Sequence, residues 1–303
     1  MIKRTLAITI PLLLSLGCSA GGSTEGGTTV TEEPGATLMP GDTSPSVTPP
    51  TTPSAVSGTG QLFDPEDVEP TDECDGNIPV VFRDFNDSHP DFEMDFSGDG
   101  VRLNLISPTL GTDNKPVFAS GVGCPARDNS QVCRTDFNPT TPVITSATTF
   151  DQWYRDVNGV NIKFEKELEL TANPNTGVYA YTSNDFFPLA PTDGFGITPP
   201  GQGKNFLFTT EIHLTFTYVA HQSFTFRGDD DLWIFVNKRL ALDLGAMHGV
   251  ASGTIDFDAQ AEKLGILPGR DYSMDIFHAE RHTSASNFTI ETNIACFTPA
   301  TVF

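Results

Sequence analysis

Three consecutive carboxylates, Asp229, Asp230 and Asp231, form the most chemically informative segment of the sequence. They precede the apolar run Leu232 to Val236, which predicts a strand covered on both faces. Adjacent carboxylates about 6 Å apart repel by roughly 1 to 3 kcal/mol per pair, so three in a row require compensation. A hard cation such as calcium is the simplest compensator. The alternative is an acidic turn that caps its own backbone amides, and the residues alone leave both interpretations open.

Two consecutive aspartates can share one ion only with a particular backbone geometry. On a regular strand, neighbouring side chains point to opposite faces of the sheet. Asp229 and Asp230 therefore reach one cation only if the backbone bends or if their peptide bond is cis. A cis non-proline bond costs about 3 to 4 kcal/mol, which metal binding could offset.

Other polar clusters have simpler interpretations. His278, Glu280 and His282 would lie on one face of a strand and could bind zinc. A hydrogen-bonded histidine and a salt-bridged glutamate on a sheet face explain the same residues, and we favour that interpretation. The segment from Asp95 to Gly100 begins like a calcium loop, but its twelfth position is Ile106, so we predict a turn.

No pair of residues predicts an enzyme. A glycosidase needs two carboxylates at a set separation, one with a raised pKa. Glu165, Glu167 and Glu169 alternate with apolar residues and predict the solvated face of a strand instead. Trp153 and Trp233 could stack on sugar rings, but tryptophan in such apolar surroundings is more often part of the core.

The elements that must position these residues are mainly strands. Beyond Ile78, apolar and polar residues alternate in short runs separated by Gly, Pro, Asn and Asp. The clearest runs are Ile212 to Tyr218, Ser223 to Phe226, Tyr272 to Ala279 and Phe288 to Ile294. One helix is expected over Phe150 to Asp156, opened by a capping box at Thr149 to Gln152. Many short strands with turn signals predict an all-β sandwich or barrel.

The N-terminus has the layout of a signal peptide. Lys3 and Arg4 precede the apolar stretch Leu6 to Leu16, which is too short to span a bilayer. Gly17-Cys18 ends a segment that resembles a bacterial lipobox, which implies acylation of Cys18; ordinary secretion with Cys18 as a bystander is the alternative. From residue 19 to about 72 the composition is rich in Gly, Ser, Thr and Pro, which predicts a disordered tether.

Charge and cysteines restrict the partners and the compartment. The net charge of -22 leaves no basic patch for a phosphate backbone, so we expect no nucleic-acid partner. If Cys18 carries lipid, four cysteines remain, and three pairings are possible in an oxidising compartment. We predict Cys124–Cys133, which closes a small loop, and Cys74–Cys296, which joins the two ends of the patterned region.

A family resemblance covers roughly residues 78 to 294. The segment from Phe226 to Asn237, with Leu240 to Gly245 and His248, resembles the signature of the fibro-slime domain. Further blocks occur in the same order, namely Arg83 to Phe85, His89 to Glu93, Trp153 to Asn161, Asn184 to Leu189, Phe208 to Ile212 and Ala279 to Phe288. That family is similar to the carbohydrate-binding β-sandwich domain, of jelly-roll type, found in anthrax protective antigen and the yeast flocculins.

The resemblance implies a calcium site and a glycan site. In flocculin-type lectins the first two acids of the turn are joined by a cis peptide and hold calcium, and these positions match Asp229 and Asp230. A later loop supplies an asparagine, for which Asn287 is the counterpart, and Asp231 either joins the metal or caps the turn. Glycan hydroxyls complete the calcium shell in those lectins. We expect further ligand contacts from His248, Glu280, Arg281 and His282.

Two positions depart from the family pattern. Asn237-Lys238 stands where Asn-Gly is usual in the hairpin, so a lysine would need a positive φ. Ala246 stands where a second glycine is usual.

These observations predict a signal peptide (1–17), a lipid-anchored low-complexity linker (18–73), a fibro-slime β-sandwich domain (74–297) and a C-terminal tail (298–303). The predicted function is non-enzymatic, calcium-dependent binding of glycans or extracellular polysaccharide. We expect the lipid anchor to hold the protein on the outer membrane or cell surface. A structural component of extracellular matrix or slime is the alternative, and a glycoside-acting enzyme is a third.

Overall fold

The computed structural model describes residues 74, 76–94, 100–127 and 130–300. The predicted signal peptide, Cys18, the tether and most of the Asp95 to Gly100 turn lie outside the described residues. Within the described part, no helix is both long and apolar enough to cross a membrane.

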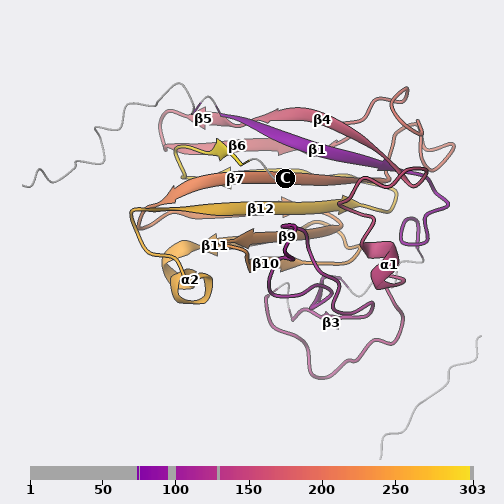
Figure 1. The fold of residues 1–303 in the computed structure, drawn as a ribbon, viewed down its shortest axis with the longest axis horizontal. Helices are drawn as coiled ribbons and strands as arrows, with labels where there is room; N and C mark the ends of the chain where they lie inside the picture. Colours follow the sequence, from indigo (N-terminus) through magenta and orange to yellow (C-terminus); the bar gives the residue numbers. More distant parts are fainter. Residues whose placement is uncertain (1–73, 75, 95–99, 128–129, 301–303) are drawn as a thin grey trace, which may run out of the picture. The chain divides into compact units, whose positions relative to one another are not determined.

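Two antiparallel sheets make up the fold and confirm the predicted all-β sandwich (Figure 1). The larger sheet has the order β10 (Arg239–Leu244), β9 (Asp231–Val236), β12 (Arg270–Glu280), β7 (Phe208–Tyr218), β1 (Asn77–Phe85) and β4 (Asn161–Glu169), with β14 (Thr298–Pro299) paired to β7. The smaller sheet has the order β11 (Ala251–Asp256), β8 (Ser223–Gly228), β13 (Phe288–Thr292), β6 (Val178–Ser183) and β5 (Thr171–Asn173). A short ladder joins β2 (Arg102–Leu103) to β3 (Cys124–Pro125). Because β14 belongs to the larger sheet, the domain extends past the predicted boundary at residue 297.

The core between the sheets follows from the alternation of apolar and polar residues. Ile212, Leu214 and Phe216 of β7 are buried in one cluster with Phe224 and Phe226 of β8. Removing apolar surface from water is the main favourable term in folding, about 25 cal/mol per Å². The prediction of a half-buried strand is confirmed for Ser223 to Phe226, whereas in Ile212 to Tyr218 the polar His213 is buried as well.

A second core covers the outer face of the larger sheet. Trp153, Phe150 and Trp233 pack there, with Trp153 and Phe150 rings 4.9 Å apart between centroids. Both tryptophans are fully buried, and their indole nitrogens donate to Asp91 and Asp243. The core interpretation of the tryptophans is therefore confirmed, and every residue of β9 is buried, as the apolar run predicted.

The helices differ from the prediction. The helix predicted over Phe150 to Asp156 is wrong, because α1 (Ala147–Phe150) ends where that prediction begins; the capping box is formed by Ser146 and Thr149. The second, α2 (Phe257–Leu264), was not predicted; Asp256 caps its N-terminus and Gly265 ends it in the left-handed conformation.

Local predictions about the disulfides and turns are confirmed. Cys74 is bonded to Cys296 and Cys124 to Cys133. The predicted solvated strand is β4, whose three glutamates are exposed. Asn237 and Lys238 both have positive φ, 51° and 62°, and Ala246 has a φ of 76°.

Candidate functional site

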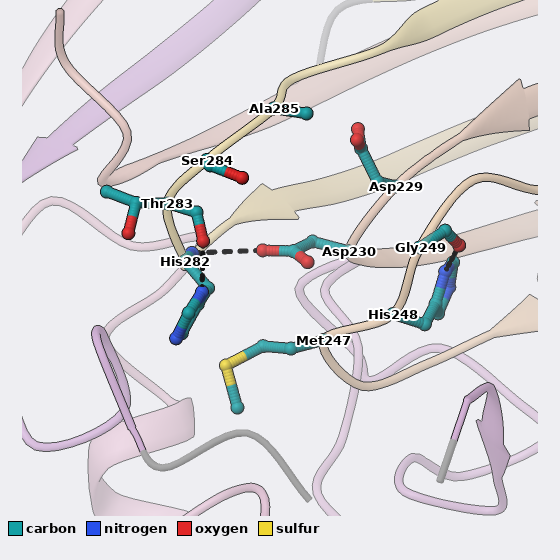
Figure 2. A pocket seen from close by; sticks show the side chains of 9 residues that line it. All are labelled: Asp229, Asp230, Met247, His248, Gly249, His282, Thr283, Ser284 and Ala285. Carbon is teal, nitrogen blue, oxygen red and sulfur yellow. Dashed lines mark hydrogen bonds between the residues drawn. The ribbon is translucent and has the colours of Figure 1, made fainter. Parts of the chain in front are cut away.

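Three loops at one end of the sandwich surround a surface cavity of about 270 Å³. They are the β8–β9 turn around residues 228–231, the β10–β11 loop at 245–250 and the β12–β13 loop at 281–287. Figure 2 shows the lining side chains. The cavity is lined by Asp229, Asp230, Met247, His248, Gly249, His282, Thr283, Ser284 and Ala285.

The acidic turn is bent in its backbone. Asp230 has a φ of 57°, in the left-handed region that most residues avoid. Among the described residues the cis peptide bond is Thr198-Pro199, so the cis bond expected between Asp229 and Asp230 is wrong. The sequence allowed two geometries that bring consecutive aspartates to one cavity, a cis peptide bond or a bent backbone. The structure has the bent backbone, with the bend at Asp230.

Gly228 allows the turn to approach the β12–β13 loop. A β carbon at this position would lie 2.5 Å from the carbonyl oxygen of Asn287, closer than such atoms pack. Glycine is therefore required for this contact. The close approach brings Asn287 beside Asp229, as the resemblance implied. The Asn287 amide nitrogen donates to Asp229 Oδ1 at 2.5 Å, and its Nδ2 donates to Oδ2 at 2.7 Å.

Asp230 is held by backbone amides. Its Oδ2 accepts from the amide nitrogens of Arg281 and His282, at 2.9 and 3.0 Å. Its own amide donates to the carbonyl of His248 at 3.3 Å, which links the turn to the β10–β11 loop. Burial, together with the charges of Asp231 and Asp229, raises the pKa of Asp230 to about 8, despite these bonds and the positive charge of Arg281.

Asp231 and Arg281 lie away from the cavity. Both Asp231 oxygens are occupied, since Oδ2 accepts from Arg281 Nε at 2.7 Å and Oδ1 from the Ala246 amide at 2.7 Å. Neither residue lines the cavity, and both are fully buried. The geometry therefore supports the capping role of Asp231 and gives no support to a metal role for it or to a ligand contact for Arg281.

The ring nitrogens of the two histidines at the cavity form hydrogen bonds with backbone carbonyls. His248 places Nδ1 2.7 Å from the carbonyl of Gly249 and Nε2 3.2 Å from that of Leu244. His282 Nδ1 bonds the carbonyl of Thr283. Both rings line the cavity, as expected for ligand contacts, on opposite sides of Asp230 in Figure 2.

The proposed zinc cluster is not assembled. His278 is fully buried among aromatic rings, 5.3 Å from Phe288 between centroids, and burial lowers its pKa to about 3. Glu280 is also fully buried, and His282 follows the end of β12. Over the described residues, no group of three or more His, Cys, Asp or Glu side chains is arranged to hold a metal.

Some residues of the site were missed by sequence reasoning. Glu93, from the loop after β1, accepts from the amide of Thr283 through Oε1 at 3.0 Å and donates its own amide to Arg281. This contact spans 190 residues, so no local pattern predicts it. Thr283, Ser284 and Ala285 are small residues whose composition predicts a loop but no binding site.

The donor set fits a hard cation better than a transition metal. Asp229 and Asp230 supply carboxylate oxygens, and the loops add backbone carbonyls. The lining residues include no Lys or Arg that could neutralise the two acids. Burial, followed by the charges of Asp230 and Asp229, raises the pKa of the Glu280 carboxyl well above its usual value. The two acids of the lining, with no Lys or Arg beside them in the cavity, therefore fit a cation by their chemistry.

The chain is similar in sequence to several proteins of Dictyostelium discoideum. Protein psiD is 37% identical over 212 residues, which is 67% of this chain and 38% of that protein. Protein psiR is 33% identical over 232 residues, which is 71% of this chain and 21% of that protein. The chain therefore spans well under half the length of these relatives. No protein-family model matches the chain.

Solved structures give only distant similarity. A PA14 sugar-binding domain from an RTX adhesin matches with a TM-score of 0.21 and 15% identity, covering 29% of this chain and 47% of that one. The chain is thus similar in sequence to Dictyostelium psi proteins over its β-sandwich region.

Proposed function

We propose that this protein is a non-enzymatic, calcium-dependent carbohydrate-binding or adhesion module. One observation carries the proposal: Asp229 and Asp230 are both buried, 5% and 6% exposed, at a cavity whose lining contains no Lys or Arg. Two buried carboxylates at one cavity are costly, because desolvation and mutual repulsion both oppose ionisation. A bound divalent cation removes that cost.

The residues that would hold calcium are Asp229, Asp230 and Asn287. Calcium takes six to eight oxygen ligands and would supply open coordination positions for the hydroxyl groups of a sugar. Asn287 fixes the Asp229 carboxylate through two hydrogen bonds. The amides of Arg281 and His282 fix Asp230. Both acids are therefore oriented before any ligand arrives, which reduces the entropy cost of binding.

The wall of the cavity suits a small polar ligand. Thr283 and Ser284 offer hydroxyl groups, His282 of the same loop offers a ring edge, and His248 offers another from the β10–β11 loop. A site of this size holds only a small part of a polysaccharide, so we propose that useful avidity comes from many copies anchored on one surface. Lipid attachment at Cys18 and an outer-membrane location belong to this proposal.

Glycan-array binding with calcium and with chelator tests the proposal. The double variant Asp229→Asn with Asp230→Asn keeps side-chain volume and removes two charges. We expect wild-type protein to bind glycans only with calcium, and the variant to bind none under either condition.

The control variant is Glu167→Gln with Glu169→Gln, which removes two exposed charges on β4. It should bind like wild type. Glycan binding that persists in chelator, or in the aspartate double variant, contradicts calcium-dependent recognition. Calcium binding with no glycan binding across the array favours the structural matrix alternative.

A further inference from the structure

A second cavity, of about 410 Å³, is lined mainly by residues of β1, β4 and β7 of the larger sheet. In that sheet β1 lies between the other two strands (Figure 1). We call it the sheet cavity. It shares no lining residue with the cavity at the acidic turn, so the proposed function gives it no role.

The lining of the sheet cavity reverses the charge balance of the chain. The whole chain has 17 Lys and Arg residues against 39 acids, whereas this lining has four Lys and Arg residues against three acids. His213 adds a further basic group. The cavity at the acidic turn has two acids and no Lys or Arg. The two cavities therefore suit ligands of opposite charge.

Glu211, the buried acid of this lining, is already paired. It accepts from Arg83 Nη1 at 2.5 Å, from His213 Nε2 at 2.5 Å and from Lys115. The other ring nitrogen of His213 lies 2.6 Å from Asp275 Oδ1. Because an ionised carboxylate only accepts, both ring nitrogens must donate, and His213 is charged. Three largely buried cations thus face two buried acids, which leaves one positive charge in excess.

Two cations of the lining stand directly opposite each other on neighbouring strands. Arg83 of β1 and Lys163 of β4 are register partners in an antiparallel pair. Like charges at such positions are destabilising. Their acidic partners, Asp156 and Glu165, are 56% and 74% exposed, so water screens both ion pairs. An anion bound between the two cations would offset their repulsion.

Arg83 has one donor that its protein partners do not use. Its Nε donates to Asp156 at 2.9 Å and its Nη1 to Glu211, and no hydrogen bond among the described residues uses Nη2. The planar guanidinium group matches the geometry of a carboxylate. Since two hydrogen bonds already hold this group in place, little entropy is lost when a ligand binds to it.

We propose that the sheet cavity is a second binding site, independent of the cation site, for a small hydroxycarboxylate. The single excess positive charge matches one carboxylate, which would lie between Arg83 and Lys163. Asp156 and Glu165 at the rim are acceptors for hydroxyl groups of the ligand. The volume lies within the range of small-molecule sites in proteins.

The first test compares three ligands by isothermal titration calorimetry of the full chain in EDTA, which removes any contribution from divalent ions. Gluconate carries one carboxylate and several hydroxyl groups, sorbitol has the same carbon chain without the carboxylate, and acetate lacks the hydroxyl groups. We expect gluconate to bind and sorbitol to bind about 10-fold or more weakly, because sorbitol makes no hydrogen bond between charged groups. Acetate should also bind more weakly than gluconate.

Lys163→Gln tests the residues. The Lys163 side chain is 38% exposed and does not pair with Glu211, so its loss leaves no buried acid without a partner. We expect gluconate affinity to fall by about 10-fold or more. Lys163→Arg keeps the charge and should bind gluconate nearly as well as wild type. The matched control is Lys238→Gln, which removes an exposed lysine outside the sheet cavity and should not change binding.

Two further measurements locate the ligand. The double variant Asp229→Asn with Asp230→Asn should bind gluconate like wild type; a loss there would place the ligand at the acidic turn and overturn the assignment. In wild-type crystals soaked in gluconate, we expect a carboxylate oxygen about 2.7 to 3.2 Å from Arg83 Nη2. Gluconate bound elsewhere, or equal affinity of gluconate and sorbitol, overturns the site. Acetate that binds as tightly as gluconate overturns the role of the hydroxyl groups.

Discussion

Arg281 and Asp231 form a fully buried ion pair, with Nε and Nη2 each 2.7 Å from Oδ2 of the carboxylate. The pair joins the β8–β9 turn to the first residue of the β12–β13 loop. The remaining Asp231 oxygen accepts a hydrogen bond from the amide of Ala246, which connects the turn to the β10–β11 loop as well. A single buried acid therefore ties together all three loops, although it does not line the cavity itself.

Replacing Arg281 by Met should destabilise the fold by about 3 to 5 kcal/mol, because Asp231 would be left as an unpaired buried charge. Urea unfolding in EDTA measures the change without any contribution from metal. Arg227→Met is the control, since Arg227 is exposed and makes one long contact of 3.5 Å with Asn184. A loss below about 1 kcal/mol in Arg281→Met would show that the pair adds little to stability.

Gly228→Ala should disrupt the site without altering any charged residue. The added methyl group would lie 2.5 Å from the backbone oxygen of Asn287, so the β12–β13 loop must shift. Since this loop orients Asp229 and Asp230, we expect calcium affinity to fall by about 10-fold or more. Calcium titration calorimetry measures the change.

The same cavity provides a matched control for this glycine. A β carbon at Gly249 would meet no atom within 4 Å, and φ there is not positive. Gly249→Ala should therefore retain wild-type affinity. The steric argument fails if the two alanine variants bind calcium equally well.

Lys238→Gly should stabilise the protein. Lys238 has a φ of 62°, which costs a residue with a β carbon about 1 kcal/mol relative to glycine. Its neighbour Asn237 also has positive φ, as expected of a two-residue hairpin turn. We expect a gain of about 0.5 to 1 kcal/mol, measured by urea unfolding. The increased freedom of glycine in the unfolded chain offsets part of the relief.

Lys238→Ala separates the backbone effect from loss of the lysine side chain. Alanine keeps the β carbon, so this variant should gain no stability from the turn. Equal stabilisation by alanine and glycine would mean that the side chain, and not φ, sets the energy of this position.

Strands and the acidic turn were predictable because their signals are local. In β7 and β8 the apolar residues recur every second position, and in β9 the run is continuous because a second core covers its outer face. The helix α2 gave no comparable signal. It buries only Phe257 and Leu264, at its two ends, so it lacks the apolar stripe by which helices are recognised.

The parts of the site that depend on distant residues were not predictable. Glu93 reaches Thr283 across 190 residues, and Asp91 bonds Arg281 across the same interval. The bend at Asp230 was one of two geometries that the sequence allowed, because a left-handed aspartate and a cis peptide both bring the acids together. Glu280 was expected in a salt bridge on a sheet face, but it is fully buried, because β12 is covered on both faces at this end.

His213, which does not line the cavity at the acidic turn, predicts a pH-dependent contribution to stability. The ring lies between two buried carboxylates, with Nδ1 2.6 Å from Asp275 Oδ1 and Nε2 2.5 Å from Glu211 Oε1. Burial alone would lower the pKa of His213, but the hydrogen bonds to Asp275 and Glu211 outweigh it and raise the pKa. The network lowers the pKa of Glu211 to about 2 against its burial, because His213, Arg83 and Lys115 favour the charged form.

The sign of the effect follows from linkage. A histidine whose folded pKa is raised contributes stability in full below its unfolded pKa of about 6.5, and that stability is lost as pH rises through the folded value. Glu211, with a lowered pKa, contributes above about pH 4.5 and loses that contribution as pH falls toward 2. The stability difference between wild type and His213→Gln should therefore be largest between about pH 4.5 and 6.5 and should shrink as pH rises further.

Urea unfolding of both proteins from pH 4 to 9 measures this difference, with chelator present throughout. His221→Gln is the control, because that side chain is 92% exposed, and its pairing with Asp258 is screened by water. A difference for His213→Gln that stays constant across this range would mean that the imidazole is held neutral, and that one of the two short contacts is not a charged hydrogen bond.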